Sequence, residues 1–260
     1  MNSPLPFSFL ALDLDGTLLR TDKSISDRTR RAIELAVYSG LTPIVATARP
    51  PRSAEHLLDG YLADAPCVYY SGAFVRLGEE FIHKQTIPVA DASQIVNGFL
   101  DRVSEARISV EIDDQLFSTH PHVWVKPEDI GDVRPSLVRE PVKIMLHMTH
   151  CDLPDDILDD LPDSVRCILS DKGALAQICH RDVSKSDGLT RLLDRLDGTL
   201  ADVIAFGDDT NDAEMIREAG MGVAMENAVE TVKAVADRVT LSHDNDGIAL
   251  VLEELLSSSV

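Results

Sequence analysis

The sequence is poor in basic residues and contains no long apolar run, and both absences exclude classes of protein. Its 24 Lys and Arg residues stand against 44 Asp and Glu residues, which gives a formal net charge of −20 at pH 7. Such a chain offers no basic face to displace the counterions of DNA, RNA or an anionic membrane, so we expect no nucleic-acid and no membrane partner. No segment approaches the ~18 consecutive apolar residues of a membrane span. The first eight residues hold no basic stretch, so we expect no export signal.

Cysteine is also scarce and scattered. The four cysteines, Cys67, Cys151, Cys167 and Cys179, form no CxxC pair, and no histidine lies at zinc-finger spacing. We therefore expect neither a disulfide framework nor a zinc site, and we interpret the cysteines as reduced thiols of a cytoplasmic protein. With 260 residues, 44% of them hydrophobic, the chain is long enough for one or two domains with a sizeable core.

Three short runs share one design: each is apolar and each leads into polar residues. They are Phe9–Leu12, Thr42–Ala46 and Asp202–Phe206. Because they lack period-2 alternation and helical patterns lie beside them, we predict buried parallel strands. Strand–helix alternation at both ends of the chain predicts a Rossmann-like, doubly wound parallel α/β sheet, with its site beyond the carboxyl ends of the strands. The helical patterns span 27–39, 51–62, 185–196, 212–219, 228–236 and 247–256, and further short strands are predicted at 67–70, 222–225 and 238–241.

The middle of the chain changes character, which predicts a second domain inserted into the first. From about Phe81 the pattern indicates a strand, a helix over 91–105, strands over 107–112, 115–118 and 142–149, a helix over 153–161, and strands over 165–169 and 175–179. Helices with antiparallel-looking strand pairs are typical of an α+β domain. We predict a core made of residues 1–80 and 184–260, and an α+β cap of residues 81–183 that acts as a lid and sets substrate specificity.

The motif DLDGT at 13–17 carries the strongest chemical signal. Two carboxylates two residues apart at the end of a buried strand, Asp13 and Asp15, can divide the work of phosphoryl transfer. One attacks phosphorus and forms an aspartyl-phosphate, while the other moves the proton of the leaving alcohol and of the attacking water. Gly16 permits a tight turn round a ligand, and Thr17 offers a hydroxyl and an N–H to phosphate oxygens. The alternative is an ordinary turn at an Asp–Gly corner.

A second polar cluster, GDDTND at 207–212, follows the third apolar run. Asp208 at the strand end, with Asn211 and Asp212 on the turn into a helix, supplies the oxygen ligands that Mg²⁺ prefers. The alternative is plain helix capping, because Asp and Asn are favoured caps and acids suit a helix N-terminus.

Thr47 and Lys185 are the remaining candidates. A Thr47 hydroxyl at a strand end, beside backbone N–H groups, suits a phosphate oxygen, although an ordinary turn threonine before Pro50 is the alternative. Lys185 opens a predicted helix, where the helix dipole disfavours a cation. A local rule broken in this way indicates function, and near a phosphate the ammonium would neutralise charge and keep Asp13 ionised. A solvated surface lysine is the alternative.

Together these segments resemble the haloacid dehalogenase-like (HAD) hydrolases, and specifically the Cof-type phosphatases with a large C2-type α/β cap. The similarity lies in FLALDLDGTLL at 9–19, IVATARP at 44–50, VSKSDGL at 183–189, VIAFGDDTNDAEM at 203–215, AGMGVAMENAVETVKAVADRVT at 219–240 and DNDGIALVLEEL at 244–255. It covers both core segments, and the cap only by length and position.

The resemblance implies a role for each matching residue. It makes Asp13 the nucleophile and Asp15 the general acid/base. It implies that Mg²⁺ is held by the Asp13 carboxylate, the Asp15 backbone carbonyl and Asp208, with Asp212 supporting the ion directly or through water. The phosphate ligands implied are Thr17, Thr47, Lys185 and Asn211. One departure is Ser71, which stands where the family usually has Asn, so its hydrogen bond to the substrate would have a shorter reach.

The function implied is a Mg²⁺-dependent phosphomonoesterase that acts on a small phosphorylated metabolite such as a sugar phosphate. An acid at Asp15 favours turnover by hydrolysis. Two alternatives stay open: a phosphosugar mutase of the phosphomannomutase type, which shares the motif order, and a non-catalytic sensor of phosphorylated metabolites.

Overall fold

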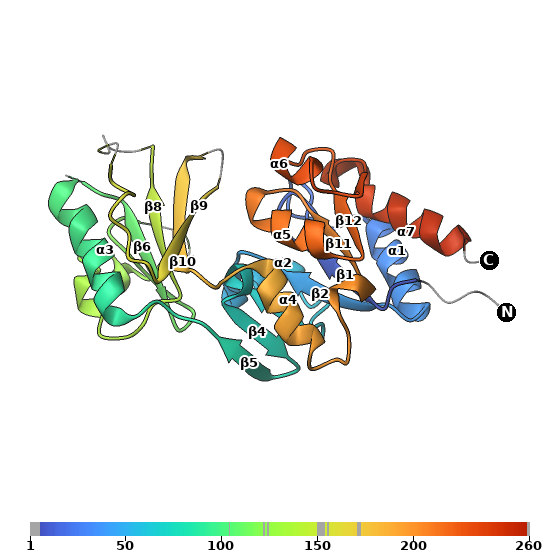
Figure 1. The fold of residues 1–260 in the computed structure, drawn as a ribbon, viewed down its shortest axis with the longest axis horizontal. Helices are drawn as coiled ribbons and strands as arrows, with labels where there is room; N and C mark the ends of the chain where they lie inside the picture. Colours follow the sequence, from blue (N-terminus) through green and yellow to red (C-terminus); the bar gives the residue numbers. More distant parts are fainter. Residues whose placement is uncertain are drawn as a thin grey trace. The chain divides into compact units, whose positions relative to one another are not determined.

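The computed structural model describes residues 6–103, 105–121, 123, 125–149, 154, 156–170 and 173–258, and it divides the chain into two compact units (Figure 1). The first unit joins Met1–Lys84 with Ser184–Val260, and the second is Gln85–Val183. Each unit has a sheet of its own, so each is described separately.

An eight-stranded sheet forms the centre of the first unit, in the order β13-β12-β11-β1-β2-β3-β4-β5. Its strands are β1 (Phe9–Leu12), β2 (Thr42–Ala46), β3 (Cys67–Tyr69), β4 (Phe74–Leu77), β5 (Glu80–Lys84), β11 (Val203–Gly207), β12 (Met221–Ala224) and β13 (Arg238–Val239). From β13 to β3 all neighbours are parallel, and β4 and β5 add an antiparallel edge. The predicted parallel α/β core is confirmed. Because β1 lies between β11 and β2, the three apolar runs of the sequence are neighbours.

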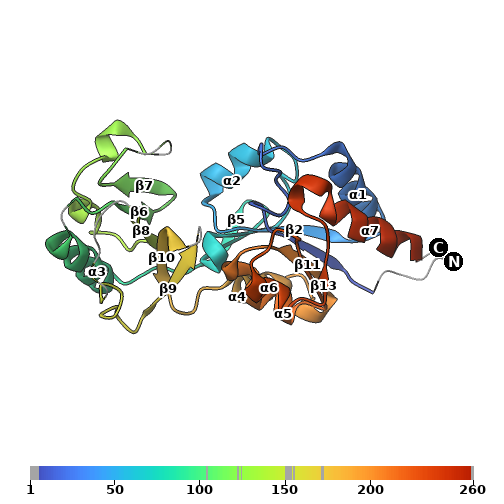
Figure 2. The same ribbon diagram turned by 90° about the horizontal axis from the view of Figure 1, so that it is seen from above.

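Helices cover both faces of this sheet (Figure 2). They are α1 (Asp27–Tyr38), α2 (Pro51–Leu58), α4 (Lys185–Leu193), α5 (Ala213–Glu218), α6 (Glu230–Lys233) and α7 (Gly247–Ser258). Successive strand residues point to opposite faces, so Phe9 and Ala11 pack with Leu189 of α4 and Met215 of α5 in one apolar core. Helices α1 and α7 lie side by side against the opposite face (Figures 1 and 2). With both faces covered, the central strands β1 and β11 are apolar throughout, and β2 is apolar after Thr42.

The second unit is built on a five-stranded antiparallel sheet, in the order β7-β6-β8-β10-β9. Its elements are α3 (Val89–Arg102), β6 (Ile108–Ile112), β7 (Gln115–Ser118), β8 (Lys143–His147), β9 (Val165–Ser170) and β10 (Leu175–His180). Helix α3 packs Ile95 and Phe99 into an apolar core that includes Ile108 and Val110 of β6. The alternate residues of β6, Ser109 and Glu111, are buried on the other face. The unit therefore has one apolar and one polar sheet face.

The strand expected near Phe81 does not belong to the inserted unit but to the core sheet, where it is β5. It pairs with β4, a strand that the sequence analysis did not predict. The physical cause is a β-hairpin: Gly78, at φ 60°, turns the chain between two runs with strand-forming residues. The Gly78-Glu79 pair between those runs was the signal that predicts it.

The helix expected over 153–161 is also absent where the structure describes this segment, since residues 156–160 form turns. The N–H of Ile157 donates to the Pro154 carbonyl at 3.0 Å and that of Asp159 to the Asp156 carbonyl at 3.1 Å, which are turn hydrogen bonds. Aspartates compete with the backbone for hydrogen bonds, and prolines at 154 and 162 bound the segment, so a helix gains little here. Residues 153 and 155 lie outside the described residues.

Where the structure describes the chain, it contains no helix that is both long enough and apolar enough to cross a membrane. Cys67, Cys167 and Cys179 are free thiols, with Cys67 and Cys179 buried. Cys151 lies outside the described residues.

Candidate active site

The polar residues that follow β1, β2 and β11 meet at one edge of the core sheet. Asp13 continues β1, and its N–H donates to the Phe206 carbonyl of β11 at 3.1 Å. Thr47 continues β2, and its N–H donates to the Val68 carbonyl of β3 at 2.8 Å. Asp208 follows Gly207, the last residue of β11. From β1 the chain adds β2 and β3 on one side and later β11, β12 and β13 on the other. Doubly wound sheets bind ligands at the carboxyl ends of the strands where the strand order reverses in this way.

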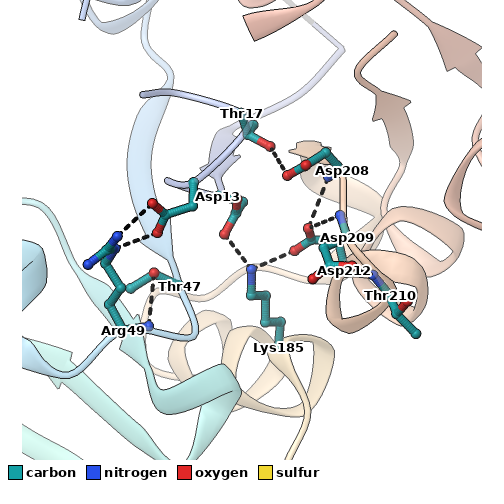
Figure 3. Close-up of polar contacts among 10 residues, drawn as sticks. Asp13, Thr17, Thr47, Arg49, Lys185, Asp208, Asp209, Thr210 and Asp212 are labelled. Carbon is teal, nitrogen blue, oxygen red and sulfur yellow. Dashed lines mark hydrogen bonds and ion pairs between the residues drawn. The ribbon is translucent and has the colours of Figure 1, made fainter. Parts of the chain in front are cut away.

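Lys185 lies at the centre of this cluster (Figure 3). It is the first residue of α4, and Ser184 caps the helix by accepting the N–H of Asp187 at 3.1 Å. The Lys185 side chain is fully buried, and its Nζ donates at 2.5 Å to Oδ1 of Asp13 and at 2.5 Å to Oδ1 of Asp212. Burial disfavours the charged ammonium, but the two carboxylates outweigh it and raise the pKa of Lys185. The lysine therefore stays charged.

The carboxylates outnumber this cation. Asp13, Asp208 and Asp212 each offer an oxygen, and these oxygens lie within 4.8 Å of one another. Burial, together with Asp212 and Asp208, raises the pKa of Asp13 well above its usual value in spite of Lys185. Burial and the neighbouring Asp212 raise the pKa of Asp208 to about 7. Burial is the main cause of both increases, and the mutual repulsion of carboxylates that share a single ammonium adds to it.

Asp212 binds the loop that carries Asp208. Its Oδ2 accepts the N–H of Asp208 at 3.0 Å and of Asp209 at 3.1 Å, while its Oδ1 accepts Lys185 (Figure 3). Both carboxylate oxygens therefore already hold protein donors, and the side chain is fully buried. Helix α5 begins at the next residue, Ala213. Asp212 thus fixes the turn between β11 and α5.

The turn after β1 is held against Asp208. The Thr17 hydroxyl, which is buried, donates to Oδ1 of Asp208 at 3.0 Å (Figure 3). Gly16 adopts φ +77°, and a Cβ at this position would overlap the Asp208 carboxylate. Glycine is therefore required both by the left-handed backbone and by the close approach.

Thr47 and Ser71 bring two loops together beside Asp13. Thr47 is buried, and its hydroxyl oxygen accepts the N–H of Arg49 at 3.1 Å. The N–H of Ser71 donates to the Thr47 carbonyl at 2.9 Å, with Ser71 in the left-handed region at φ 57°. The loop after β3 thus lies against the loop after β2.

Asn211 is half-buried, and its side-chain oxygen is buried without a hydrogen-bond partner among the described residues. Buried polar atoms in folded proteins nearly always have a partner. An amide oxygen only accepts hydrogen bonds, so this atom calls for a donor and not for a phosphate oxygen. The predicted phosphate contact of Asn211 would have to come from its amide nitrogen, and it stays a prediction.

Two cations on Asp15 were missed by the sequence analysis. The guanidinium of Arg49 donates from Nε to Oδ2 and from a second nitrogen to Oδ1 at 2.7 Å, and Lys23 Nζ donates to Oδ1 at 2.8 Å. Arg49 is itself anchored by a 2.7 Å bond to Ser53. Burial raises the pKa of Asp15, but the hydrogen bonds from Arg49 and Lys23 outweigh it, and the net pKa is lowered. Arg49 lies two residues before α2, ahead of its N-cap Pro50, and no local sequence pattern marks it as a partner of Asp15.

The cluster fits a hard divalent cation. Mg²⁺ binds carboxylate oxygens and keeps several waters, so one or two carboxylates with space beside them suffice. Asp13 and Asp208 could supply these oxygens, since they belong to a group of three carboxylates whose only ammonium among the described residues is that of Lys185. No cysteine or histidine contributes to the described cluster, which suits a hard rather than a soft metal.

The sequence matches a family described as haloacid dehalogenase-like hydrolase over residues 10–252. The 5-amino-6-(5-phospho-D-ribitylamino)uracil phosphatase YitU of Bacillus subtilis is 29% identical, with 95% of this chain and 97% of YitU covered. A phosphoglycolate phosphatase of Methanopyrus kandleri is 30% identical, with 96% of this chain and 97% of that protein covered. Among solved structures, the HAD subclass IIB sugar phosphatase BT4131 has a TM-score of 0.82 at 25% identity, with 97% of this chain and 100% of that chain covered.

Proposed function

The chain belongs to the haloacid dehalogenase-like hydrolases, and on that premise we propose that it is a Mg²⁺-dependent phosphomonoesterase that works through an aspartyl-phosphate on Asp13. As a phosphatase of this family it acts on phosphoric monoesters. The observation that carries the proposal is the cluster of Asp13, Asp208 and Asp212 round the single ammonium of Lys185. The cluster provides a nucleophile, a cation site and a fixed positive charge together.

Asp13 and Asp208 would hold the metal, with the Asp15 backbone carbonyl as a further ligand. Bound there, Mg²⁺ would neutralise charge on the substrate phosphate and on the two carboxylates. Asp212 supports the ion through the turn: its oxygens hold Lys185 and the N–H groups of the loop that carries Asp208. In this proposal Asp212 does not bind the metal itself but positions the loop that carries the ligand Asp208.

The first chemical step is attack by an Asp13 carboxylate oxygen on phosphorus, which forms the acyl-phosphate bond and breaks the bond from phosphorus to the ester oxygen. Lys185 favours the ionised form of Asp13 for this step, because its Nζ lies 2.5 Å from the carboxylate, and a bound cation would lower the pKa of Asp13 further. Lys185, Thr47, Thr17 and Asn211 are proposed to bind the phosphate oxygens. Lys185 has the clearest support, from its buried ammonium. Asn211 would bind a phosphate oxygen through its amide nitrogen, because its amide oxygen only accepts hydrogen bonds.

Asp15 is proposed to protonate the leaving oxygen and then to take the proton of the water that hydrolyses the acyl-phosphate. In the structure both its oxygens are bound by Arg49, and one also by Lys23. These contacts orient the carboxylate and keep it ionised. Substrate binding must therefore compete with Arg49 before Asp15 can donate a proton.

The substrate proposed is a small phosphorylated metabolite, and specifically a sugar phosphate. YitU, the phosphoglycolate phosphatase and BT4131 are named for small phosphorylated, hydroxylated or carboxylated compounds. We assign substrate discrimination, and the function of a lid, to the inserted domain, whose sheet has a polar face with Ser109 and Glu111. A chain of net charge −20 remains a poor partner for nucleic acid or an anionic membrane, and a cytoplasmic location is part of the proposal.

The test is release of phosphate from p-nitrophenyl phosphate and from a panel of sugar phosphates, with Mg²⁺ and with EDTA. We expect Mg²⁺-dependent release that D13N and D208N abolish. D209N is the matched control, because Asp209 lies in the same turn but outside the carboxylate cluster. Phosphorus NMR of the products separates hydrolysis from a mutase, which would yield an isomeric sugar phosphate faster than free phosphate. A wild-type protein inert with every ester at millimolar Mg²⁺ would overturn the proposal.

A further inference from the structure

Asn227 connects the two loops that carry the proposed metal ligands. It lies in the turn after β12, and its Nδ2 donates to the Gly16 carbonyl at 2.8 Å and to Oδ2 of Asp208 at 3.3 Å. The other Asp208 oxygen accepts the Thr17 hydroxyl at 3.0 Å (Figure 3). Neutral donors therefore hold the Asp208 carboxylate from two sides. Each carboxylate oxygen accepts more than one hydrogen bond or ligand, so a cation still has lone pairs to bind.

The orientation of the Asn227 amide follows from its partners. The Gly16 carbonyl and the Asp208 carboxylate only accept, so they require the amide nitrogen. The amide oxygen accepts the backbone N–H of His243 at 3.1 Å and meets Nδ1 of the same residue at 2.9 Å. Since this oxygen only accepts, Nδ1 carries the ring proton. All polar atoms of the Asn227 side chain are thus engaged in one arrangement.

His243 is fixed in turn by its own neighbours. It lies in the loop before α7, and its Nε2 is 3.2 Å from the hydroxyl of Thr21 and 3.7 Å from Oδ2 of Asp244. Asp244 accepts both the N–H of Thr21 at 2.9 Å and its hydroxyl at 2.7 Å. The loop before α7 is therefore bound to the segment that follows the DLDGT motif. His243 in turn hydrogen-bonds to Asn227, and Asn227 hydrogen-bonds to Asp208.

We propose that Asn227 is a positioning residue for Asp208 and that His243 positions Asn227, so that the loop before α7 sets the affinity of the site for its divalent cation. The proposal rests on the proposed function, which makes Asp208 a metal ligand. Partners that orient metal ligands typically change metal affinity about 10–100-fold when they are removed. Because Asn227 makes only one hydrogen bond to the metal-ligating residue Asp208, at 3.3 Å, we expect a change in metal affinity of about 10-fold, the lower end of that range.

Exposure separates this role from a general structural one. Asn227 is exposed, so water can replace its hydrogen bonds in N227A and the metal-free loss of stability should be small. N227A is therefore expected to melt only about 2–4 °C below wild type in EDTA. A change in cation affinity that is larger than this loss of metal-free stability explains is what positioning predicts.

The experiment measures thermal stabilisation of the full chain by Mg²⁺ alone, without substrate, for wild type, N227A, H243A and H243N. We expect the Mg²⁺ concentration at half-maximal stabilisation to rise about 10-fold in N227A and about threefold in H243A. H243N is expected to recover most of the loss, because an asparagine amide can also donate to Asn227. At saturating Mg²⁺, we expect the KM of N227A and H243A for p-nitrophenyl phosphate to stay within twofold of the wild-type value.

N245A is the matched control. Asn245 lies in the same loop, and its amide donates to Ser242 and not to Asn227 among the hydrogen bonds of the described residues. It should leave the Mg²⁺ midpoint unchanged, and D208N should abolish the Mg²⁺ effect. If wild type responds to Mg²⁺ and N227A matches it within twofold, the positioning role is wrong while the proposed function stands. If wild type shows no Mg²⁺ response, the metal assignment fails and this inference fails with it.

Discussion

Replacing Lys185 by methionine tests how the carboxylate cluster is held together, because the change removes the charge and keeps most of the volume. Nζ of Lys185 lies 2.5 Å from a carboxylate oxygen of Asp13 and 2.5 Å from one of Asp212. The exposed fractions of the three residues are 1%, 5% and 0%. In metal-free K185M, two buried carboxylates are left facing each other without their ammonium.

Removal of one partner of a buried ion pair costs about 3–5 kcal/mol, because the remaining charge stays desolvated. Asp13 already has a raised pKa, so in K185M it takes up a proton more easily, and this relief places the expected loss near the lower limit, about 3 kcal/mol. For a chain of this size, 1 kcal/mol shifts the melting temperature by about 2–4 °C. K185M should therefore melt about 6–12 °C below wild type in EDTA.

The loss should depend on pH in a defined direction. A carboxyl whose folded pKa lies above its unfolded value favours the folded state at low pH and loses that contribution as the pH rises through the folded pKa. Losing Lys185 raises the pKa of Asp13 further, so the deficit of K185M should be larger at pH 8 than at pH 5. The assay is thermal unfolding followed by circular dichroism, using the transition of the core unit.

The double variant D13N/K185M provides the control, since it removes the buried charge that K185M leaves without a partner. It should melt above K185M, and the cycle should give a coupling of at least about 1 kcal/mol. The reasoning is refuted if K185M melts within 2 °C of wild type, or if D13N brings no recovery. Phosphatase activity of K185M should fall about 100-fold or more, as expected when a fixed charge on the reacting phosphate is removed.

Three further predictions test the turn, the acid/base group and the C-terminal loop. G16A should reduce activity about 100-fold by displacing the proposed metal ligand, whereas G60A, at a similar φ of +80° but in open space, should stay active. R49Q removes hydrogen bonds that keep the pKa of Asp15 low, so the basic limb of the kcat/KM–pH profile should move up by about one pH unit; an unmoved limb contradicts this. Burial raises the pKa of Asp246, but the hydrogen bonds that Ser26 and Arg20 donate to Asp246 outweigh burial, and the net pKa is lowered. D246N should lose about 2 kcal/mol at pH 7, and the loss should shrink as the pH falls below about 4 and vanish only below the lowered pKa of folded Asp246, where wild-type Asp246 is protonated in both states; a difference in urea unfolding that stays constant with pH would be the contrary result.

The strand ends could be predicted from sequence because the physics there is local. β1, β2 and β11 are buried on both faces, so each is an uninterrupted apolar run that leads into polar residues. Parallel strands bring those polar residues to one edge. The structure places Asp13, Thr47 and Asp208 there, and Lys185 reaches them from the start of α4.

The antiparallel edge of the core sheet was not predicted, because β4 and β5 are short and only partly apolar. Their pairing depends on a tight turn at Gly78, a signal of one or two residues rather than a periodic pattern. For the aspartate-rich segment 153–161, before β9, the prediction erred in the opposite way. Its apolar spacing suggests a helix, but its aspartates and the prolines that flank them favour turns. In both segments, local backbone chemistry decided against the hydrophobic pattern.

The partners of Asp15 and Asp208 could not be predicted from sequence for a different reason. Arg49 is 34 residues from Asp15, and Asn227 is 19 residues from Asp208, and neither pair shares an element. Hydrogen bonds of this kind exist only after three loops have been brought to one sheet edge. The side-chain types do not reveal them, since arginine and asparagine are common at any turn.

The acidity of the chain is compatible with an anionic substrate because of where the charges lie. Charges on the surface act over only about 8 Å at physiological salt, whereas the buried cluster is screened much less. Within the cluster the balance is set by Lys185 against Asp13, Asp208 and Asp212, so one divalent cation brings the formal sum from −2 to zero. In the proposed function, a phosphate at this site would meet the charge of Lys185 and of the bound cation at close range, whereas most of the net charge of −20 lies on the screened surface. A divalent cation would also lower the pKa values of Asp13 and Asp208, which burial and the neighbouring carboxylates raise.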